Sequence, residues 1–373
     1  MTRSRAVFVA LVAVALLLLG ARAAITVRDA GLSDFRCFYE AGRLVRLGLD
    51  PYDRATWSAA LSDPAGHPPC ADTFAYPLWT GMAFAPLSVL SEPAALAAWE
   101  IVIVASVVGA TLLLARTWPM TGGARLLLVL VLWSQPMFSA VANAQLGPVV
   151  LLGLAVIAYG FARNRDRVAA AAWWLLLIKP NVIPLALVGL PLVRSRRFAA
   201  WALGGGLAIL LASLALVPTW PADVLRIIFG QQLLVDRDLG TLSALAIVLG
   251  LPSAVGTVAA LIAIVLFGAL LPRRSLEGRE LVAILIVASC VVTPYLRPHD
   301  EVILAVCWAA AIVRAPYAVI AIAIVLPWTI TVLSLVGAPL ALHALVALAT
   351  AALTVYALRS PVPARVAGEV VRA

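Results

Sequence analysis

Charged residues are scarce in this sequence. Asp, Glu, Lys and Arg make up 12% of its 373 residues, whereas they make up about a quarter of a typical soluble domain. Apolar residues make up 64%, and the mean hydropathy is +1.04. Because so much apolar surface exceeds what one soluble core can bury, and long apolar runs recur from end to end, the sequence predicts an all-α integral membrane protein. We expect residues 1–373 to form a single polytopic membrane domain without a separate soluble domain.

Histidine is limited to three residues, and no two of them are close in sequence. A His-x-x-x-His metal site is therefore excluded, and we expect neither a metal ion nor another cofactor. No G-x-S-x-G motif of a serine hydrolase occurs. The run Gly204-Gly205-Gly206 lies inside an apolar segment, where helix packing explains it better than a nucleotide-binding loop. A pump driven by nucleotide hydrolysis is therefore excluded.

The chain has four cysteines. Cys290 and Cys307 lie in apolar runs and are expected to be small buried hydrophobic residues. Cys37 and Cys70 share the first long polar segment, which we place outside the membrane, where a disulfide can persist. Spacing alone does not decide whether these two form a bridge.

The net charge of +9 comes from arginines that cluster between apolar runs. This distribution is typical of membrane proteins, which retain Lys and Arg in short cytoplasmic loops. A nucleic-acid-binding surface needs a contiguous basic face, and the sequence has none, so we expect no nucleic-acid partner. The clusters are Arg3/Arg5, Arg163/Arg165/Arg167, Arg194/Arg196/Arg197, Arg273/Arg274/Arg279 and Arg359/Arg365/Arg372.

The apolar runs predict about twelve transmembrane helices in the plasma membrane, with both termini cytoplasmic. Residues 6–24 are expected to be a retained first span, although Ala21-Arg22-Ala23 also resembles a signal-peptide cleavage site. Residues 25–75 form a long first extracytoplasmic loop, and 76–90, which contains Pro86, dips into the membrane without crossing it. This threading leaves 17 of the 26 arginines on the cytoplasmic side. The further spans are 94–115, 125–142, 147–162, 168–178, 182–193, 198–217, 242–271, 280–296, 301–314, 316–336 and 340–358.

Four polar stretches share the predicted outer face: the loop 25–75, the stretch 143–147, Lys179-Pro180-Asn181 and the stretch 295–301. The loop holds seven of the 18 acidic residues. Lys179 is the only lysine, and it interrupts two apolar runs that are too short to cross a hydrocarbon core of ~30 Å. A lysine at a helix end can simply anchor the helix in the interface. Because Pro180 and Asn181 break the helix here, we favour a polar cavity and a functional role.

Other polar residues carry weaker signals. Asp34 begins a helical pattern, and its alternative role is an N-cap, which Ser33 can equally fill. His299-Asp300 is a candidate catalytic pair, although adjacent side chains need not face one another. His343 lies alone in an apolar run and is expected to be structural, and the role of Glu100 is left open.

Six motifs occur in a fixed order along most of the chain. They are Asp34-Phe35-x-x-Phe38-Tyr39-x-Ala41-Gly42, Gly48-x-Asp50-Pro51-Tyr52-Asp53, Phe74-x-Tyr76-Pro77-Leu78, Asn143-x-Gln145-x-Gly147, Ile178-Lys179-Pro180 and Thr293-Pro294-x-x-x-x-His299-Asp300. This ordered set resembles family 87 of the glycosyltransferases, which are polyprenyl-phosphate-sugar-dependent mannosyltransferases and arabinofuranosyltransferases of the GT-C type. In this chain Leu78 follows Pro77, where the family often has a second proline.

The resemblance implies a GT-C-type bundle, with some helices short or broken, and inverting transfer of a sugar from a polyprenyl-phosphate donor to a glycolipid or cell-envelope glycan. It implies that Asp34 is the catalytic base, that Lys179 and His299 bind the donor phosphate, and that Arg297 also reaches it. Membrane lipid is the surrounding partner. We expect Asp34, Lys179 and His299 to lie within about 10–12 Å of one another. Further substrate-binding candidates are Arg36, Tyr76, Asn143 and Gln145.

Two alternatives belong to other classes of protein. A secondary transporter also uses broken helices, but places its substrate near the membrane midplane between repeated halves, and the sequence has no internal repeat. A lipid flippase is the second alternative. Mannose is the first expectation for the sugar and arabinofuranose the second, whereas the acceptor, the linkage and the oligomeric state do not follow from the sequence.

Overall fold

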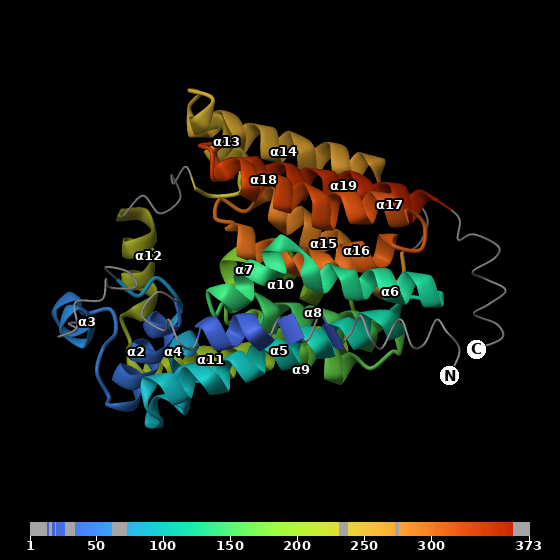
Figure 1. Cartoon of the computed structure of the whole chain (residues 1–373). Helices are drawn as coiled ribbons and strands as arrows, with labels where there is room; N and C mark the ends of the chain where they lie inside the picture. Colours follow the sequence, from blue (N-terminus) through green and yellow to red (C-terminus); the bar gives the residue numbers. More distant parts are fainter. Residues whose placement is uncertain are drawn as a thin grey trace.

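The computed structural model describes residues 13–14, 17–18, 20–26, 34–61, 73–230, 238–272 and 276–360. Every regular element in these ranges is a helix, and the longer helices run roughly parallel to one another (Figure 1). About half of the predicted first span, 6–24, lies outside the described residues, so the retained span stays a prediction. Cys37 is disulfide-bonded, and its candidate partner Cys70 lies outside the described residues. The α-helices are α2 (Phe35–Arg46), α3 (Arg54–Leu61), α4 (Leu78–Phe84), α5 (Glu92–Thr117), α6 (Gly122–Leu130), α7 (Gln135–Ala142), α8 (Gly147–Ala162), α9 (Asp166–Leu176), α10 (Pro184–Val193), α11 (Arg196–Leu216), α12 (Trp220–Gly230), α13 (Leu242–Val248), α14 (Ser253–Leu270), α15 (Gly278–Val292), α16 (Ala305–Ala311), α17 (Pro316–Ile320), α18 (Leu326–Ser334) and α19 (Ala344–Arg359).

Five helical segments in the described ranges are long and apolar enough to cross a membrane, or six if a bent pair counts as one span. They are α5, α11, α14, the segment Pro316–Ser334 that includes α17 and α18, and the segment Leu340–Arg359 that includes α19. The bent pair joins Gly122–Trp133 to Gln135–Ala142 at an angle of 45°. The chain is therefore an all-helical membrane protein, and the total of about twelve spans stays a prediction.

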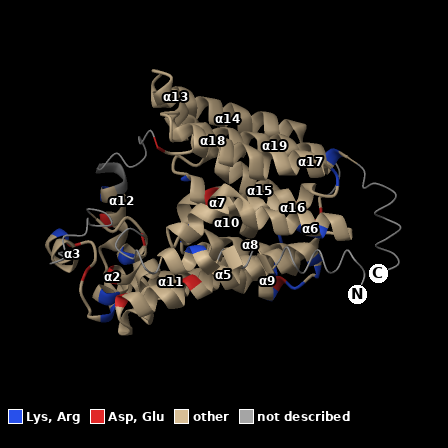
Figure 2. Cartoon of the chain, in the orientation of Figure 1, with Lys and Arg blue, Asp and Glu red and all other residues tan. Residues whose placement is uncertain are grey.

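The loops that carry the internal arginine clusters meet at one end of the bundle. Arg194 donates to Asp166, with its Nη2 3.1 Å from Oδ1, which joins the start of α9 to the end of α10. The Arg279 guanidinium donates to the Thr117 carbonyl at the end of α5 (2.8 Å). At the same end, Arg359 of α19 donates to the carbonyl of Leu270, the last residue of α14 (2.6 Å). Figure 2 shows basic residues at this end, which we call the arginine end.

The predicted outer segments meet at the opposite end of the bundle, where α2, α3, α4 and α12 gather (Figure 1). The segment 76–90 forms only the seven-residue helix α4 and a short 3-10 turn (Leu87–Val89), as expected for a segment that does not cross the membrane. It packs so closely on α2 that a Cβ on Gly42 would lie 2.6 Å from the carbonyl carbon of Phe84. This close contact explains why glycine follows Ala41 in the first motif.

Several predicted spans are interrupted. The run 242–271 is not one helix, because α13 ends at Val248 and the chain reverses through Gly250, whose φ of +75° suits glycine, and Pro252. The run 125–142 bends before Pro136, which cannot continue the backbone hydrogen-bond pattern of α6. In the run 280–296, the helix α15 ends at Val292, and a 3-10 helix (Pro298–Leu304) then precedes α16.

Short helices place three polar turns between the two ends of α5, the longest helix. At 1.5 Å per residue, α9 and α10 extend only ~15–17 Å from the arginine end, and α8 and α15 extend ~23–24 Å. In contrast, the 26 residues of α5 extend ~39 Å. The chain turns that follow or precede these shorter helices contain Gln145, Lys179 and Thr293. These three residues therefore lie ~15–24 Å from the arginine end, within the ~39 Å that α5 spans.

Candidate active site

Asp34 directly precedes α2 and lies at the centre of the candidate site. It occupies the N-cap position, yet its side chain makes no capping hydrogen bond. Instead its carboxylate accepts a hydrogen bond from the side-chain amide of Gln145, which lies 111 positions further along the chain. Burial raises the pKa of the Asp34 carboxyl above its ordinary value, and the positive charge of Lys179 opposes this rise only in part. The contact to Gln145 thus favours a functional interpretation of Asp34 over a capping role.

Gln145 is held by a tight turn between α7 and α8. Ala144 adopts a φ of +49°, and its carbonyl accepts a hydrogen bond from the buried indole of Trp99 (2.9 Å). The Gln145 side chain is fully buried, and its Oε1 accepts a hydrogen bond from Lys179 Nζ (3.0 Å) while its Nε2 donates to Asp34. The amide therefore links the carboxylate of Asp34 to the ammonium of Lys179. A Cβ on Gly147 would lie 2.9 Å from Val302, so glycine allows α8 to begin directly against the segment 298–304.

Lys179 lies at the turn between α9 and α10, where the helix is broken as the sequence predicts. Its Nζ donates to Asp300 Oδ1 over 2.6 Å, and the side chains are 1% and 0% exposed respectively. A buried ammonium requires such a partner, because an isolated charge in a low-dielectric interior is strongly disfavoured. The lysine is therefore paired inside the protein, and it does not face lipid.

The turn that carries Lys179 is fixed on two sides. Thr293, at the end of α15, donates from its hydroxyl to the Asn181 carbonyl (2.7 Å). On the other side, Trp79 and Thr80 of α4 donate to the carbonyls of Leu177 and Ile178, over 2.7 and 3.0 Å. These contacts satisfy backbone carbonyls that a helix break leaves without intrahelical donors. Helix α4 thus helps to position the lysine.

The late outer segment supplies the remaining charged groups. His299 is buried, and its Nε2 lies 3.8 Å from Asp300 Oδ1, so these adjacent side chains do approach each other. The Arg297 backbone N–H donates to Asp300 Oδ2 (3.3 Å), and its guanidinium donates to the hydroxyl of Tyr295 (3.2 Å). The structure therefore brings Asp34, Lys179 and His299 together through Gln145 and Asp300. Their chemical roles stay predictions.

The other candidate residues are placed differently. Arg36 is buried and its guanidinium donates to the Leu61 carbonyl of α3 (3.4 Å). Asn143 donates from its side chain to the Ser139 carbonyl within α7 (2.8 Å). Tyr76 packs its ring on Phe38 of α2, with ring centroids 5.2 Å apart. The phenol of Tyr76 is within electrostatic range of Lys179, Asp34 and Asp300.

Two polar contacts did not follow from the sequence. Asp300 is the counter-ion of Lys179, although the motif drew attention to His299 beside it. Glu301 and His343 form a second buried pair, in which a hydrogen bond joins His343 Nδ1 and Glu301 Oε2 (3.0 Å). The expectation that His343 is structural agrees with this contact. The only available signal was that each residue is a rare polar group in an apolar run.

Two other observations bear on the predicted chemistry. Glu100 is buried in α5, and neither of its carboxylate oxygens has a hydrogen-bond partner in the described part of the chain. Within the same ranges, no group of three or more His, Cys, Asp or Glu residues is arranged to hold a metal ion.

Comparison with known proteins identifies a matching family. The family model described as glycosyltransferase family 87 matches residues 74–294, which is more than half of the chain. No curated protein and no solved structure matches the chain. The matched segment contains Gln145 and Lys179, while Asp34 precedes it and Asp300 follows it, so the charged network connects the matched segment to both flanking parts of the chain. The six ordered motifs and this match identify the chain as a member of glycosyltransferase family 87.

Proposed function

We propose that this protein is an inverting glycosyltransferase that moves a sugar from a polyprenyl-phosphate donor to a glycolipid or cell-envelope glycan at the extracytoplasmic face. The observation that carries this proposal is the contact network Asp34–Gln145–Lys179–Asp300. It combines one carboxylate of raised pKa with cationic groups at one end of a membrane-embedded bundle. No observation on the described residues favours a transporter or a flippase.

Asp34 is the proposed base. The acceptor hydroxyl attacks the anomeric carbon, its proton passes to the Asp34 carboxylate, and the bond from the anomeric carbon to the phosphate oxygen breaks as polyprenyl phosphate leaves. One displacement inverts the configuration of the sugar. A raised pKa suits this role, because a more basic carboxylate accepts the proton more readily as long as it is ionised at the working pH.

The cations replace a general acid. Phosphate leaves as an anion, so the transition state needs positive charge beside the leaving oxygen more than it needs a proton. An ammonium group has three N–H donors, and Lys179 uses two of them on Gln145 and Asp300. The third donor is assigned to the donor phosphate, together with Arg297 and the imidazole of His299.

The depth of the site favours a lipid-linked donor. Gln145 and Lys179 lie ~17–24 Å from the arginine end, within a hydrocarbon core of ~30 Å. A lipid phosphate can reach this depth from within the outer leaflet, whereas a water-soluble nucleotide sugar would have to leave water. The positive-inside rule favours a cytoplasmic location for the arginine end, which supports a site on the extracytoplasmic side.

The test is transfer of radiolabelled mannose from polyprenyl-phosphate mannose to a membrane lipid extract. Wild type is compared with Asp34→Asn at equal expression, and Glu92→Gln serves as a matched control at the outer end of α5. We expect labelled lipid from wild type and from the control, and none from Asp34→Asn. Equal labelling by Asp34→Asn would remove Asp34 from the chemistry. If wild type labels nothing, the arabinofuranose donor is tested next.

A further inference from the structure

Trp99 makes contacts on both sides of the hydrogen bond between Gln145 and Asp34. It belongs to α5 and is 6% exposed, so protein encloses almost all of its indole. The indole N–H donates to the Ala144 carbonyl (2.9 Å), and the ring packs on Phe84 of α4, with centroids 4.6 Å apart. One side chain thus reaches both the turn between α7 and α8 and the segment that packs on α2.

The contact to Ala144 acts on the backbone directly before Gln145. At the end of α7 the Gln145 N–H donates to the Ala140 carbonyl (2.9 Å), and this closure of the helix holds Ala144 in the left-handed region, at φ +49°. Glycine is usual at such a position, because a Cβ makes the conformation unfavourable. A strained residue keeps this conformation only when its surroundings hold it there. The indole does so by donating to the carbonyl of this fully buried residue.

The contact to Phe84 acts on the other side of the same hydrogen bond. Phe84 packs edge to face on Phe35, with ring centroids 6.1 Å apart. Phe35 is 1% exposed and directly follows Asp34 in the chain. Buried rings in close contact resist displacement. The row Trp99–Phe84–Phe35 therefore connects the turn that carries Gln145 to the residue beside Asp34.

We propose that Trp99 is a positioning residue, which holds the Gln145 amide where it donates to Asp34 and accepts from Lys179. The inference rests on the proposed function, and it adds the residue that aligns the central hydrogen bonds. The amide fulfils both roles in only one orientation, because an ammonium cannot accept and an ionised carboxylate cannot donate. A shift of Gln145 therefore weakens both contacts at once. A displacement of about 1 Å near the chemistry can lower the rate about 100-fold.

The experiment is a double-mutant cycle of Trp99→Phe and Gln145→Met, with kcat/KM for sugar transfer measured over a range of pH. Trp99→Phe keeps an aromatic ring against Phe84 but removes the donor to the Ala144 carbonyl. We expect it to lower kcat/KM about 10- to 100-fold. The pH below which kcat/KM falls should also rise by about one unit, because the hydrogen bond from Gln145 stabilises the ionised form of Asp34. In the Gln145→Met background, Trp99→Phe should change neither quantity further, whereas additive losses would overturn the proposal.

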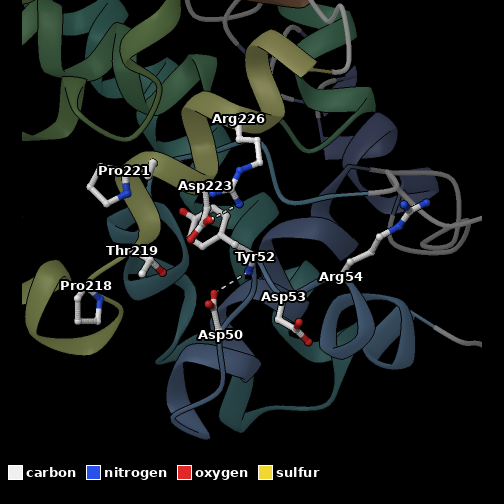
Figure 3. A pocket seen from close by; sticks show the side chains of 10 residues that line it. Asp50, Tyr52, Asp53, Arg54, Pro218, Thr219, Pro221, Asp223 and Arg226 are labelled. Carbon is white, nitrogen blue, oxygen red and sulfur yellow. Dashed lines mark hydrogen bonds and ion pairs between the residues drawn. The ribbon is translucent and has the colours of Figure 1, made fainter.

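Two controls address other causes of a loss. Trp328→Phe removes an indole that donates to the Trp133 carbonyl over the same 2.9 Å, but before the start of α7 instead of after its end. Arg226→Gln removes a positive charge at the open surface hollow between segments 50–54 and 218–226 (Figure 3), where the Arg226 side chain is 76% exposed. We expect both controls to keep the wild-type kcat/KM and its pH dependence. A comparable loss in Trp328→Phe would overturn the positioning role.

A spectroscopic measurement separates this inference from the transferase proposal. Infrared spectra of the full chain in nanodiscs, recorded over pH as a difference from Asp34→Asn, follow the ionisation of the Asp34 carboxyl without any substrate. We expect Trp99→Phe to raise the pKa of this carboxyl, and an unchanged titration would overturn the proposal whether or not wild type transfers sugar. If the pKa rises but wild type transfers no sugar, the transferase proposal fails and the link from Trp99 to Asp34 remains. The other charges that act on this carboxyl are unchanged in Trp99→Phe, and they are those of Lys179, Arg297 and Asp300.

Discussion

The Lys179–Asp300 ion pair gives the sharpest test of how the network is built. Both side chains are almost completely buried, and their charged atoms are 2.6 Å apart. Replacing Lys179 by Met keeps a long apolar side chain but removes the ammonium. Within the described residues, Asp300 then keeps the backbone N–H of Arg297 as its hydrogen-bond donor, 3.3 Å from Oδ2. A buried carboxylate is left without its counter-ion.

Removing one partner of a buried ion pair typically lowers the free energy of unfolding by about 3–5 kcal/mol, whereas replacing both partners by apolar residues is often neutral. We therefore expect Lys179→Met to destabilise the protein by about 3–5 kcal/mol, and Lys179→Met/Asp300→Leu to recover most of that loss. Neither variant is expected to transfer sugar, because both lack the cation. Stability and activity should thus separate in the double variant.

The free energy of unfolding is measured by reversible SDS titration in mixed micelles, and transfer activity is measured on the same preparations. Arg226→Met is the stability control, because its pair with Asp223 is exposed, with 76% of the Arg226 side chain accessible, and should contribute less than about 1 kcal/mol. If Lys179→Met lowers the free energy of unfolding by less than about 1 kcal/mol, the expectation that Lys179 and Asp300 form a buried ion pair is wrong. Transfer activity in the double variant would refute the role of Lys179 in catalysis.

Two further predictions concern the neighbours of this pair. Burial raises the pKa of Asp34, and the base must be ionised to accept a proton. We therefore expect kcat/KM to fall as the pH drops through a value above the ordinary aspartate pKa of about 3.9. A pH profile of kcat/KM measured on wild type checks this, and a fall at or below the ordinary pKa contradicts it. Because Glu301 is fully buried against His343, His343→Phe should lower the free energy of unfolding by about 1–3 kcal/mol, while His343→Asn, which keeps a donor near the Nδ1 position, should lose less. Equal losses in the two His343 variants, measured by the same SDS titration, would show that the hydrogen bond to Glu301 does not stabilise the protein.

The class of the protein follows from the sequence alone. Apolar runs with few charges leave a helical membrane protein as the stable solution, because backbone groups in lipid must be satisfied within each segment. The arginine clusters also indicate correctly which loops share one end, since charged groups avoid the hydrocarbon core whatever the packing. The rarity of lysine and the helix break at Pro180 direct attention to Lys179 before any contact is known.

The shapes of the spans depend on more than hydropathy. Residues 242–271 are apolar throughout, yet the chain reverses within them, and a Cβ on Gly256 would lie 2.1 Å from the Leu242 carbonyl oxygen where α13 folds back on α14. An apolar segment keeps its side chains away from water equally well as one long helix or as two packed helices. Side-chain contacts between segments select one of these arrangements.

The partners of the polar residues belong to the tertiary structure. The sequence determined the helical membrane class and drew attention to Asp34, Lys179 and His299 as candidate site residues. The tertiary structure decided that Gln145 bridges Asp34 to Lys179, and that Asp300 and not His299 pairs with the lysine. The physical reason is that a residue's type determines what it costs to bury its charge. The group that offsets this cost lies more than 100 residues away in the sequence for both Asp34 and Lys179, and the packing of the helices determines which group that is.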